Sequence, residues 1–478
     1  MSAAMNVPPP TENRRWPRAV KFIVGNEACE RFSYYGMRSI LAGYLTGAVL
    51  QGGLGQDADT STEIIHSFVF VNYFMPLLGA WLSDKFIGRY HTILWVSLFY
   101  CAGHGVLACS DFAGGVHGKM ILLCTGLALI AFGSGGIKPC VSAFMGDQFR
   151  PDQSHLLQKA YGAFYWAINL GSFFSFLVIP WVKNHHGYSA AFAVPGILMA
   201  VATFIFWRGT KHYVRVPPSR TVKFAGFFRV VITTLCHRRT PGENFWAAAQ
   251  RRFTAREVDA AKSVMPILFV FAFVPVFWSL FDQTNSTWVL QGEKMLPANF
   301  LGLTIGAEQM QSMNPLIVML LVPLFTLGIY PRIGKFASPL KRMAYGMFLA
   351  AASYLVVAAL QRQIETGAQL SVLWQTVPYV ILTAGEVLLS TTGLEFAFRE
   401  AAPEMKSSIM SFWLLTVALG NLLVGVITKL CATPGSGEAS VSTGRFLMYA
   451  GLTFVVAILF SLVARTYPYR DATAAQGK

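Results

Sequence analysis

The chain has 478 residues, of which 54% are hydrophobic and 13% charged, and it carries a formal net charge of +15. Its charged share is about half of the roughly 25% that soluble domains carry, which excludes an ordinary soluble enzyme. The composition instead predicts an all-α, polytopic membrane protein.

Apolar runs long enough to cross a membrane core of about 30 Å, which takes about 20 helical residues, recur along the whole chain. We expect twelve spans, near residues 22–48, 63–82, 92–109, 120–145, 160–182, 188–207, 263–290, 303–330, 341–361, 371–397, 407–431 and 446–464. The first run is too long and too charged for a cleaved signal sequence, so we expect it to remain as a span.

The first span carries charges that share one helical face. Offsets of three, four, seven, eight and eleven residues align Glu27, Glu30, Arg31, Tyr34, Tyr35 and Arg38. A charge in hydrocarbon costs roughly 2.5 kcal/mol or more, so this face must turn toward partners or a water-filled cavity. The first span therefore predicts a pore or a pocket between helices.

The distribution of basic residues predicts the orientation in the membrane. If the N-terminus is cytoplasmic, most Lys and Arg residues fall in cytoplasmic loops. The positive-inside rule then places both termini in the cytoplasm of a multi-pass protein of the cell membrane. The same bias explains the net charge without a nucleic-acid partner.

The stretch 208–262 interrupts the regular spacing of the spans. It is basic and contains Pro217 and Pro218, and we expect a cytoplasmic linker between a six-helix bundle at 1–207 and a second one at 263–478. Its segment 223–239 suits a helix lying in the membrane interface, although a solvated linker fits nearly as well. Two six-span halves are typical of the major facilitator architecture, in which substrate binds at the midplane between rocking halves.

A loop motif between the second and third spans favours the same architecture. Residues 79–90 read GAWLSDKFIGRY, with a glycine for close helix approach, an acid that can pair, and a Gly-Arg turn. The pattern resembles the cytoplasmic gate motif of the facilitator superfamily.

Ionisable residues within the predicted spans differ in charge between the halves. Beyond the first span, the first half contributes His66 and Lys138, and the second half contributes Asp282 and Glu386. A positive wall facing a negative wall suits a zwitterion such as a small peptide, because each charged end is costly to desolvate unless it is paired. Aromatic residues at similar depth can line side-chain pockets: Tyr34, Tyr35, Tyr73, Trp278 and Trp413.

Each of these residues has a structural alternative. Glu27, Glu30 and Arg31 can simply neutralise one another, and Lys138 can lie near a membrane surface and extend its ammonium group to water. His66 fits a satisfied polar core residue as well as a proton site. The two tryptophans also fit packing or lipid-facing roles.

Four sequence blocks carry a resemblance to one family. Residues 27–36 (EACERFSYYG) resemble the ExxER motif of the proton-dependent oligopeptide transporter family, and residues 164–172 (FYWAINLGS) resemble its FYxxINxGS signature. The loop motif and a block from Gly385-Glu386 to Met410-Ser411-Phe412-Trp413 agree with it. The resemblance therefore touches both halves of the chain.

The resemblance implies roles for particular residues. The proton-responsive cluster would consist of Glu27, Glu30, Arg31 and Lys138, with His66 as a further proton site. The peptide carboxylate would be held by Arg31, Lys138 and Tyr35, and the peptide amino group by Glu386, Asn169 and Asn314. Arg38 would contact peptide and pair with Asp282 as an outer gate. The side-chain pockets would be lined by Tyr34, Tyr73, Trp278, Ser390 and Trp413.

Three features resemble the animal members of the family more than many bacterial ones. Asp282 stands where many bacterial members have glutamate, 208–262 shows no extra spanning helices, and His66 begins the second span. We expect no cofactor other than protons as the coupling ion, and a functional monomer. The seven cysteines lack metal-ligand spacing and are expected to be packing residues.

We therefore expect a proton-coupled symporter that imports di- and tripeptides by alternating access. A transporter of nitrate or another small organic solute on the same fold is the alternative, although an anion carrier has less use for Glu386. An intramembrane hydrolase is disfavoured because the chain has no HExxH motif and no paired intramembrane aspartates. A receptor without transport activity is a further alternative, which an uptake measurement distinguishes.

Overall fold

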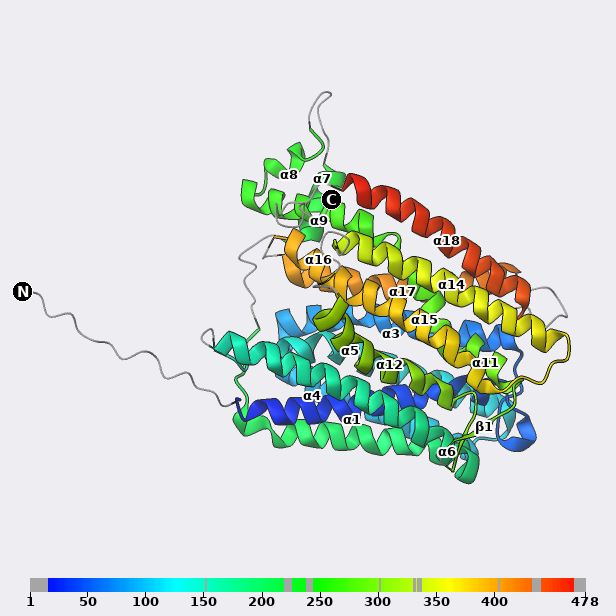
Figure 1. Cartoon of the computed structure of the whole chain (residues 1–478). Coiled ribbons are helices and arrows are strands. Elements are labelled where there is room, and N and C mark those ends of the chain that lie inside the picture. Colours follow the sequence, from blue (N-terminus) through cyan, green and yellow to red (C-terminus); the bar gives the residue numbers. More distant parts are fainter. Residues whose placement is uncertain are drawn as a thin grey trace, which may run out of the picture.

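A computed structural model describes residues 16–150, 153–218, 226–237, 244–300, 302–329, 332, 338–402, 405–431 and 440–467. The described chain is a bundle of long, roughly parallel or antiparallel helices (Figure 1). Residues 19–208 form one side of the bundle, and residues 339–466 form the other.

The described N-terminal half consists mainly of long helices joined by short turns. Its helices are α1 (Ala19–Ser39), α2 (Leu41–Thr46), α3 (Ala58–Leu82), α4 (Gly88–Ala108), α5 (Gly115–Gly146) and α6 (Ser154–Arg208). A π-helical turn, Ser83–Ile87, leads from α3 to Gly88, whose φ of 77° breaks the helix there. Gly187, with φ of 81°, similarly divides α6 into two helical segments. Glycine allows both breaks because it has no Cβ to clash at positive φ.

The C-terminal half is less regular. Its helices are α9 (Ala255–Phe271), α10 (Val274–Phe281), α11 (Thr287–Glu293), α12 (Met313–Pro323), α14 (Pro339–Glu365), α15 (Thr376–Glu386), α16 (Thr392–Glu400), α17 (Lys406–Cys431) and α18 (Thr443–Thr466). A short antiparallel hairpin of β1 (Ala298–Phe300) and β2 (Leu303–Ile305) lies between α11 and α12. The eighth predicted span, 303–330, therefore begins too early: residues 303–305 are a strand, and helical structure starts at Gln309.

The predicted spans correspond to helices of the described chain. Eight of its helices are long and apolar enough to cross a membrane, and α9 with α10–α11 forms a further, bent pair. Two of the eight, Ala58–Ala108 and Leu156–His212, each contain two predicted spans. The first predicted span, α1–α2, is absent from this set. It carries the charged residues Glu27, Glu30, Arg31 and Arg38.

The described residues in the middle of the chain form short helices. These are α7 (Phe227–Cys236) and α8 (Ala247–Gln250), and α9 begins with a Thr254–Glu257 capping box. The helix α7 falls within the segment 223–239 that was predicted to be helical, whose two ends lie outside the described residues. In Figure 1, α7 and α8 lie at the end of the bundle where α1 begins and α18 ends. We call this the α7 end, and the opposite end, near β1, the hairpin end.

Glycines bring helices of the same half into close contact. A Cβ added to Gly79 on α3 would lie 2.5 Å from the carbonyl oxygen of Gly136 on α5, so only glycine fits there. This is the close helix approach that the loop motif predicted. Gly346 on α14 and Gly385 on α15 form a corresponding contact in the other half, where an added Cβ would lie 2.6–2.7 Å from the partner's carbonyl oxygen.

Candidate functional site

The charged face of α1 forms a compact buried cluster. The Arg31 Nε atom lies 2.8 Å from Glu27 Oε1 and 2.6 Å from Glu30 Oε2, and all three residues are buried. One guanidinium therefore serves two carboxylates. Protonation of either carboxylate would leave the other as the partner of Arg31.

Lys138 enters the same region from α5. Its Nζ atom is buried and has no hydrogen-bond partner among the described residues. It lies 4.2 Å from the ring centre of Tyr34 and 4.3 Å from that of Tyr73, which are cation–π distances. The alternative in which Lys138 extends to a membrane surface is therefore wrong, because two aromatic rings hold its ammonium group inside the bundle.

A central cavity of about 270 Å³ separates the two halves next to this cluster. Its lining includes most of the residues that the sequence predicted to contact substrate or form the gate: Tyr35, Arg38, Tyr73, Asn169, Trp278, Asp282, Asn314, Glu386 and Trp413. Four predicted contact residues are absent from this lining: Arg31, Tyr34, Lys138 and Ser390. Tyr34 is fully buried and its hydroxyl accepts a hydrogen bond from Asn72, while the Lys138 ammonium group lies against the ring of Tyr73.

The acidic side of the central cavity is formed by Glu386. Asn314 Nδ2 donates to Glu386 Oε2 at 2.7 Å and to Thr383 Oγ1 at 3.1 Å, which fixes the carboxylate in the C-terminal half. Trp278 and Trp413 lie nearby with ring centres 6.2 Å apart. Both tryptophans therefore pack against each other and also line the cavity. A packing role and a cavity-lining role are thus compatible for these residues.

Toward the hairpin end, the cavity is closed by a network between the halves. Arg38 Nη2 lies 3.2 Å from Asp282 Oδ1, as the resemblance implied, and Asn421 Nδ2 donates to Asp282 Oδ2 at 2.7 Å. His66 contacts Asn421 Oδ1 through Nδ1 at 2.7 Å and Ser286 Oγ through Nε2 at 2.9 Å. Since Asn421 Oδ1 can only accept, this network assigns the ring proton to Nδ1.

Three further contacts join the halves at the hairpin end. Lys183 Nζ lies 2.5 Å from Glu308 Oε2, Gln311 Nε2 donates to the Ser39 carbonyl oxygen, and the Ser440 amide donates to Asp59. Burial raises the pKa of Glu308, and the neighbouring Lys183 ammonium opposes that rise. The hairpin end is thus sealed by polar contacts between the halves.

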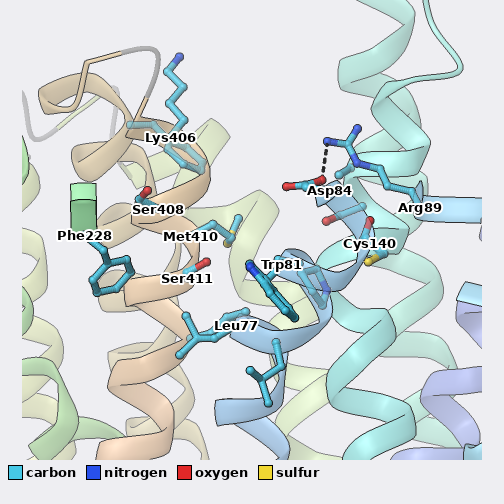
Figure 2. A pocket seen from close by; sticks show the side chains of 18 of the residues that line it. Leu77, Trp81, Asp84, Arg89, Cys140, Phe228, Lys406, Ser408, Met410 and Ser411 are labelled. Carbon is cyan, nitrogen blue, oxygen red and sulfur yellow. Dashed lines mark ion pairs between the residues drawn. The ribbon is translucent and has the colours of Figure 1, made fainter. Parts of the chain in front are cut away.

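A larger cavity of about 960 Å³, here called the α7-end cavity, lies between the halves at the opposite end. Figure 2 shows Leu77 and Trp81 of α3 on one side and Phe228 of α7 with Ser411 of α17 on the other. The ion pairs of the loop motif lie at its rim: Arg89 Nη2 is 3.7 Å from Asp84, and Arg89 Nη1 is 2.7 Å from Asp147. Leu414 lines both cavities.

Several residues of this arrangement were missed in the sequence. Asn421 and Ser286 connect His66 to Asp282, and Glu308 pairs with Lys183. The same argument that identified intramembrane charges would have found Asn421, had it been extended to uncharged polar groups within apolar runs. In the described parts of the chain, His, Cys, Asp and Glu form no group of three or more that could hold a metal ion.

Comparison with known proteins decides the family. The model of the POT family matches residues 90–441. The chain belongs to this family. Its membership confirms the resemblance carried by the four sequence blocks, and the protein is a multi-pass helical membrane protein with the major facilitator fold.

Individual relatives are similar to this chain in sequence. The chain is 39% identical to "Peptide transporter family 1" of Drosophila melanogaster over 369 residues, which are 74% of this chain and 49% of that protein. It is 37% identical to "Solute carrier family 15 member 2" of Rattus norvegicus, over 75% of this chain and 51% of that protein. The chain thus spans about half the length of the curated relatives it matches.

Solved structures of the POT family agree over almost the whole chain. An "auto inhibited POT family peptide transporter" superposes with a TM-score of 0.86 at 37% identity, covering 95% of this chain and 98% of that chain. The "POT family transporter PepTSo" gives 0.87 at 38% identity, covering 96% and 99%.

Proposed function

We propose that the protein is a proton-coupled symporter that imports di- and tripeptides by alternating access. The observation that carries the proposal is the central cavity between the halves, with the Glu386 carboxylate on one side and the cationic cluster of Arg31 and Lys138 behind the other. A zwitterionic peptide has a complementary charge at each end. The names of the relatives support a peptide substrate.

The amino end of the peptide would bind Glu386, with Asn314 and Asn169 as neighbours. Glu386 is already oriented by Asn314, and Asn169 lines the same cavity. A carboxylate at this position favours an ammonium group and disfavours a simple anion such as nitrate. The acidic side is therefore the feature that separates a peptide carrier from an anion carrier on this fold.

The carboxyl end would bind Lys138 and Arg31, with Tyr35 as a further donor. Because the Lys138 ammonium group lies against the Tyr73 ring, and Tyr73 lines the cavity whereas Lys138 does not, we infer that Tyr73 moves aside when substrate enters. Tyr34, Trp278, Ser390 and Trp413 would line side-chain pockets in states in which the cavity is larger.

Proton coupling would work through competition for Arg31. Protonating Glu27 or Glu30 removes one of its two partners, so that the cluster gains positive charge and attracts the substrate carboxylate. An inward potential of about 100 mV supplies ~2.3 kcal/mol per charge, and one pH unit adds about 1.4 kcal/mol. One proton per neutral peptide would then sustain accumulation on the order of several hundredfold.

The distribution of basic residues supports an orientation for the two ends of the molecule. We propose that both termini and the α7 end face the cytoplasm of a cell membrane and that the Arg38–Asp282 pair closes the outside. The six-helix bundles would extend over 1–207 and 263–478, joined by the linker 208–262, and rock against each other as a monomer. His66 would join the proton-coupling groups through Asn421 and Asp282. We expect no cofactor besides the coupling proton.

Uptake of labelled dialanine into proteoliposomes tests the proposal, with an imposed inward proton gradient and a negative interior. We expect the wild type to accumulate the peptide and Lys138→Ala to lose accumulation. Lys262→Ala is the matched control, because Lys262 pairs with the exposed Asp259 on the surface of α9. If dialanine is neither taken up nor able to compete, the peptide assignment fails, and nitrate and other small organic solutes are to be screened against the same gradient.

A further inference from the structure

The helix α7 is attached to the C-terminal half by its aromatic residues. The rings of Phe227 and Phe228 lie 5.2 Å and 5.4 Å from the ring of Phe412 on α17, measured between ring centres. The Arg229 guanidinium lies 5.6 Å from the ring centre of Phe253, next to the start of α9. Because Phe227 and Val230 are buried in this contact, α7 has a fixed position on the C-terminal half.

Other side chains of α7 are apolar and exposed, among them Phe228, whose ring also contacts Phe412. Phe228, Ile232 and Leu235 follow one another at helical spacing and are 55%, 56% and 61% exposed. Of these three side chains, Phe228 alone contributes to the lining of the α7-end cavity. The helix thus presents one aromatic ring to the space between the halves.

Apolar side chains of the N-terminal half lie across this cavity. Leu77, Leu78 and Trp81 of α3 contribute to its lining, and Leu78 and Trp81 are 49% and 52% exposed. Figure 2 shows Leu77 and Trp81 on the side of the cavity that faces Phe228. The surfaces that face each other are therefore largely apolar. Among the described residues, no ring contact joins Phe228 to Trp81 in this state.

The way in which α3 and α17 meet indicates how the cavity can close. The two helices are joined toward the hairpin end by the His66–Asn421 contact, and α3 is also tied there to Ser440. Toward the α7 end they diverge around the cavity. If the halves rock so that the hairpin end opens, the α7 end must close and bring the exposed face of α3 toward α17 and the attached α7.

We infer that Phe228 is part of the gate at the α7 end: it packs against Leu77 and Trp81 when the cavity closes, so that α7 latches the state that is open at the hairpin end. This inference rests on the alternating access of the proposed function but requires no particular substrate. Burial of a phenyl ring against a leucine and an indole supplies the driving force, with the edge and face contacts that aromatic pairs favour.

Disulfide trapping tests the contact directly. Phe228→Cys is combined with Leu77→Cys, and Ile232→Cys with Leu77→Cys forms the matched control, since Ile232 is equally exposed but does not line the cavity. All variants carry Cys236→Ser, because Cys236 is an exposed thiol on α7 itself. A disulfide requires Cβ atoms about 4 Å apart, so it forms only if the two walls meet.

We expect the Phe228/Leu77 pair to form a disulfide under mild oxidation, and more of it when Asp282→Ala breaks the contact that holds the hairpin end closed. The Ile232/Leu77 pair should form little in either background. Equal yields for the two pairs, or a yield for Phe228/Leu77 that does not rise with Asp282→Ala, would overturn the inference. No substrate is present in this experiment, so it can succeed even if the peptide assignment fails.

Transport by single variants gives an independent readout. We expect Phe228→Ala to reduce uptake by about tenfold, the effect of losing one well-packed aromatic contact in the closed α7 end. Phe228→Leu should recover part of the loss, and Ile232→Ala should stay near wild type. If Phe228→Ala and Ile232→Ala lose uptake and thermal stability to the same degree, α7 serves only as an anchor and the inference is wrong.

Discussion

The two ends of the molecule differ in the surfaces that the halves present to each other. At the hairpin end, the halves are joined by ion pairs and hydrogen bonds: Arg38 with Asp282, Asn421 with Asp282 and His66, and Lys183 with Glu308. At the α7 end, the ion pairs of Arg89 stay within the N-terminal half, and the surfaces that face each other are largely apolar.

This difference assigns a separate task to each end. Polar contacts between halves can be released one at a time by protonation or by a competing charge, so the hairpin end is suited to respond to protons and substrate. Apolar surfaces respond to neither and associate whenever the geometry allows. The contacts at the hairpin end would then control the equilibrium between the two states of the carrier. The α7 end would open or close as a consequence.

The largest effect is expected for Asp282→Ala. The substitution leaves Arg38, which is 2% exposed, as an uncompensated buried charge, and breaking a buried ion pair costs roughly 3–5 kcal/mol. We expect concentrative uptake to be lost while peptide binding is reduced less. Uptake and equilibrium binding measured on the same preparation check this; equal losses in both would contradict a gating role. Asp111→Ala, in the turn after α4, is the control.

A smaller effect is expected for Asn421→Leu. Leucine has a volume similar to that of asparagine but no polar group. The substitution removes the bridge between His66 and Asp282, and each buried polar group left without a partner costs roughly 1–3 kcal/mol. We expect the hairpin end to open more readily, so that the Phe228/Leu77 disulfide forms faster than in the wild-type background. An unchanged rate would mean that the bridge contributes little to the closed end.

These residues also indicate how far the sequence could predict the site. The charged cluster on α1 was visible because Glu27, Glu30 and Arg31 interrupt an apolar run at helical spacing, and the Arg38–Asp282 pair followed from the family resemblance. Asn421 was missed because only charged groups within the apolar runs were considered. Glu308 was missed although it falls in the predicted span 303–330, because it lies close to the start of that span, where a charge is ordinary.

The state of the molecule was beyond sequence reasoning for a different reason. One sequence must stabilise both states of an alternating-access carrier within a few kcal/mol of each other, so no local pattern indicates which of them a structure adopts. The contact between the Tyr73 ring and Lys138 could not be predicted from the sequence either. It depends on how the halves are arranged and not on helical periodicity.

Glu308→Gln is expected to act in the same direction as Asn421→Leu but more weakly. It removes the charge that pairs with Lys183, whose side chain is 18% exposed and therefore partly solvated without its partner. We expect a small rise in the Phe228/Leu77 disulfide yield, below that of Asp282→Ala. Lys183→Ala should reproduce the rise, whereas a rise equal to that of Asp282→Ala would show that the two ion pairs contribute equally.

The smallest effect concerns the start of α3 at the hairpin end. Asp57 caps this helix by accepting hydrogen bonds at 2.8 Å from the Thr60 amide and hydroxyl. Slight burial works against ionisation, but the bonds from Thr60 hold the pKa of Asp57 below its usual range. Replacing such a cap by alanine costs about 1 kcal/mol of stability, and we expect Asp57→Ala to lower the melting temperature accordingly.

The pH dependence of this loss follows from the sign of the shift. A carboxylate whose pKa is lower in the folded state stabilises the fold above its ordinary pKa, and that contribution disappears as the pH falls through the folded-state value. The difference in melting temperature between the wild type and Asp57→Ala should therefore be full at neutral pH and shrink in acid, while Asp57→Asn, which keeps a capping oxygen, should retain most of the stability. Since the cap lies within one half and joins nothing across the cavity, Asp57→Ala should leave the Phe228/Leu77 disulfide yield unchanged, which separates helix stability from the closing of the hairpin end.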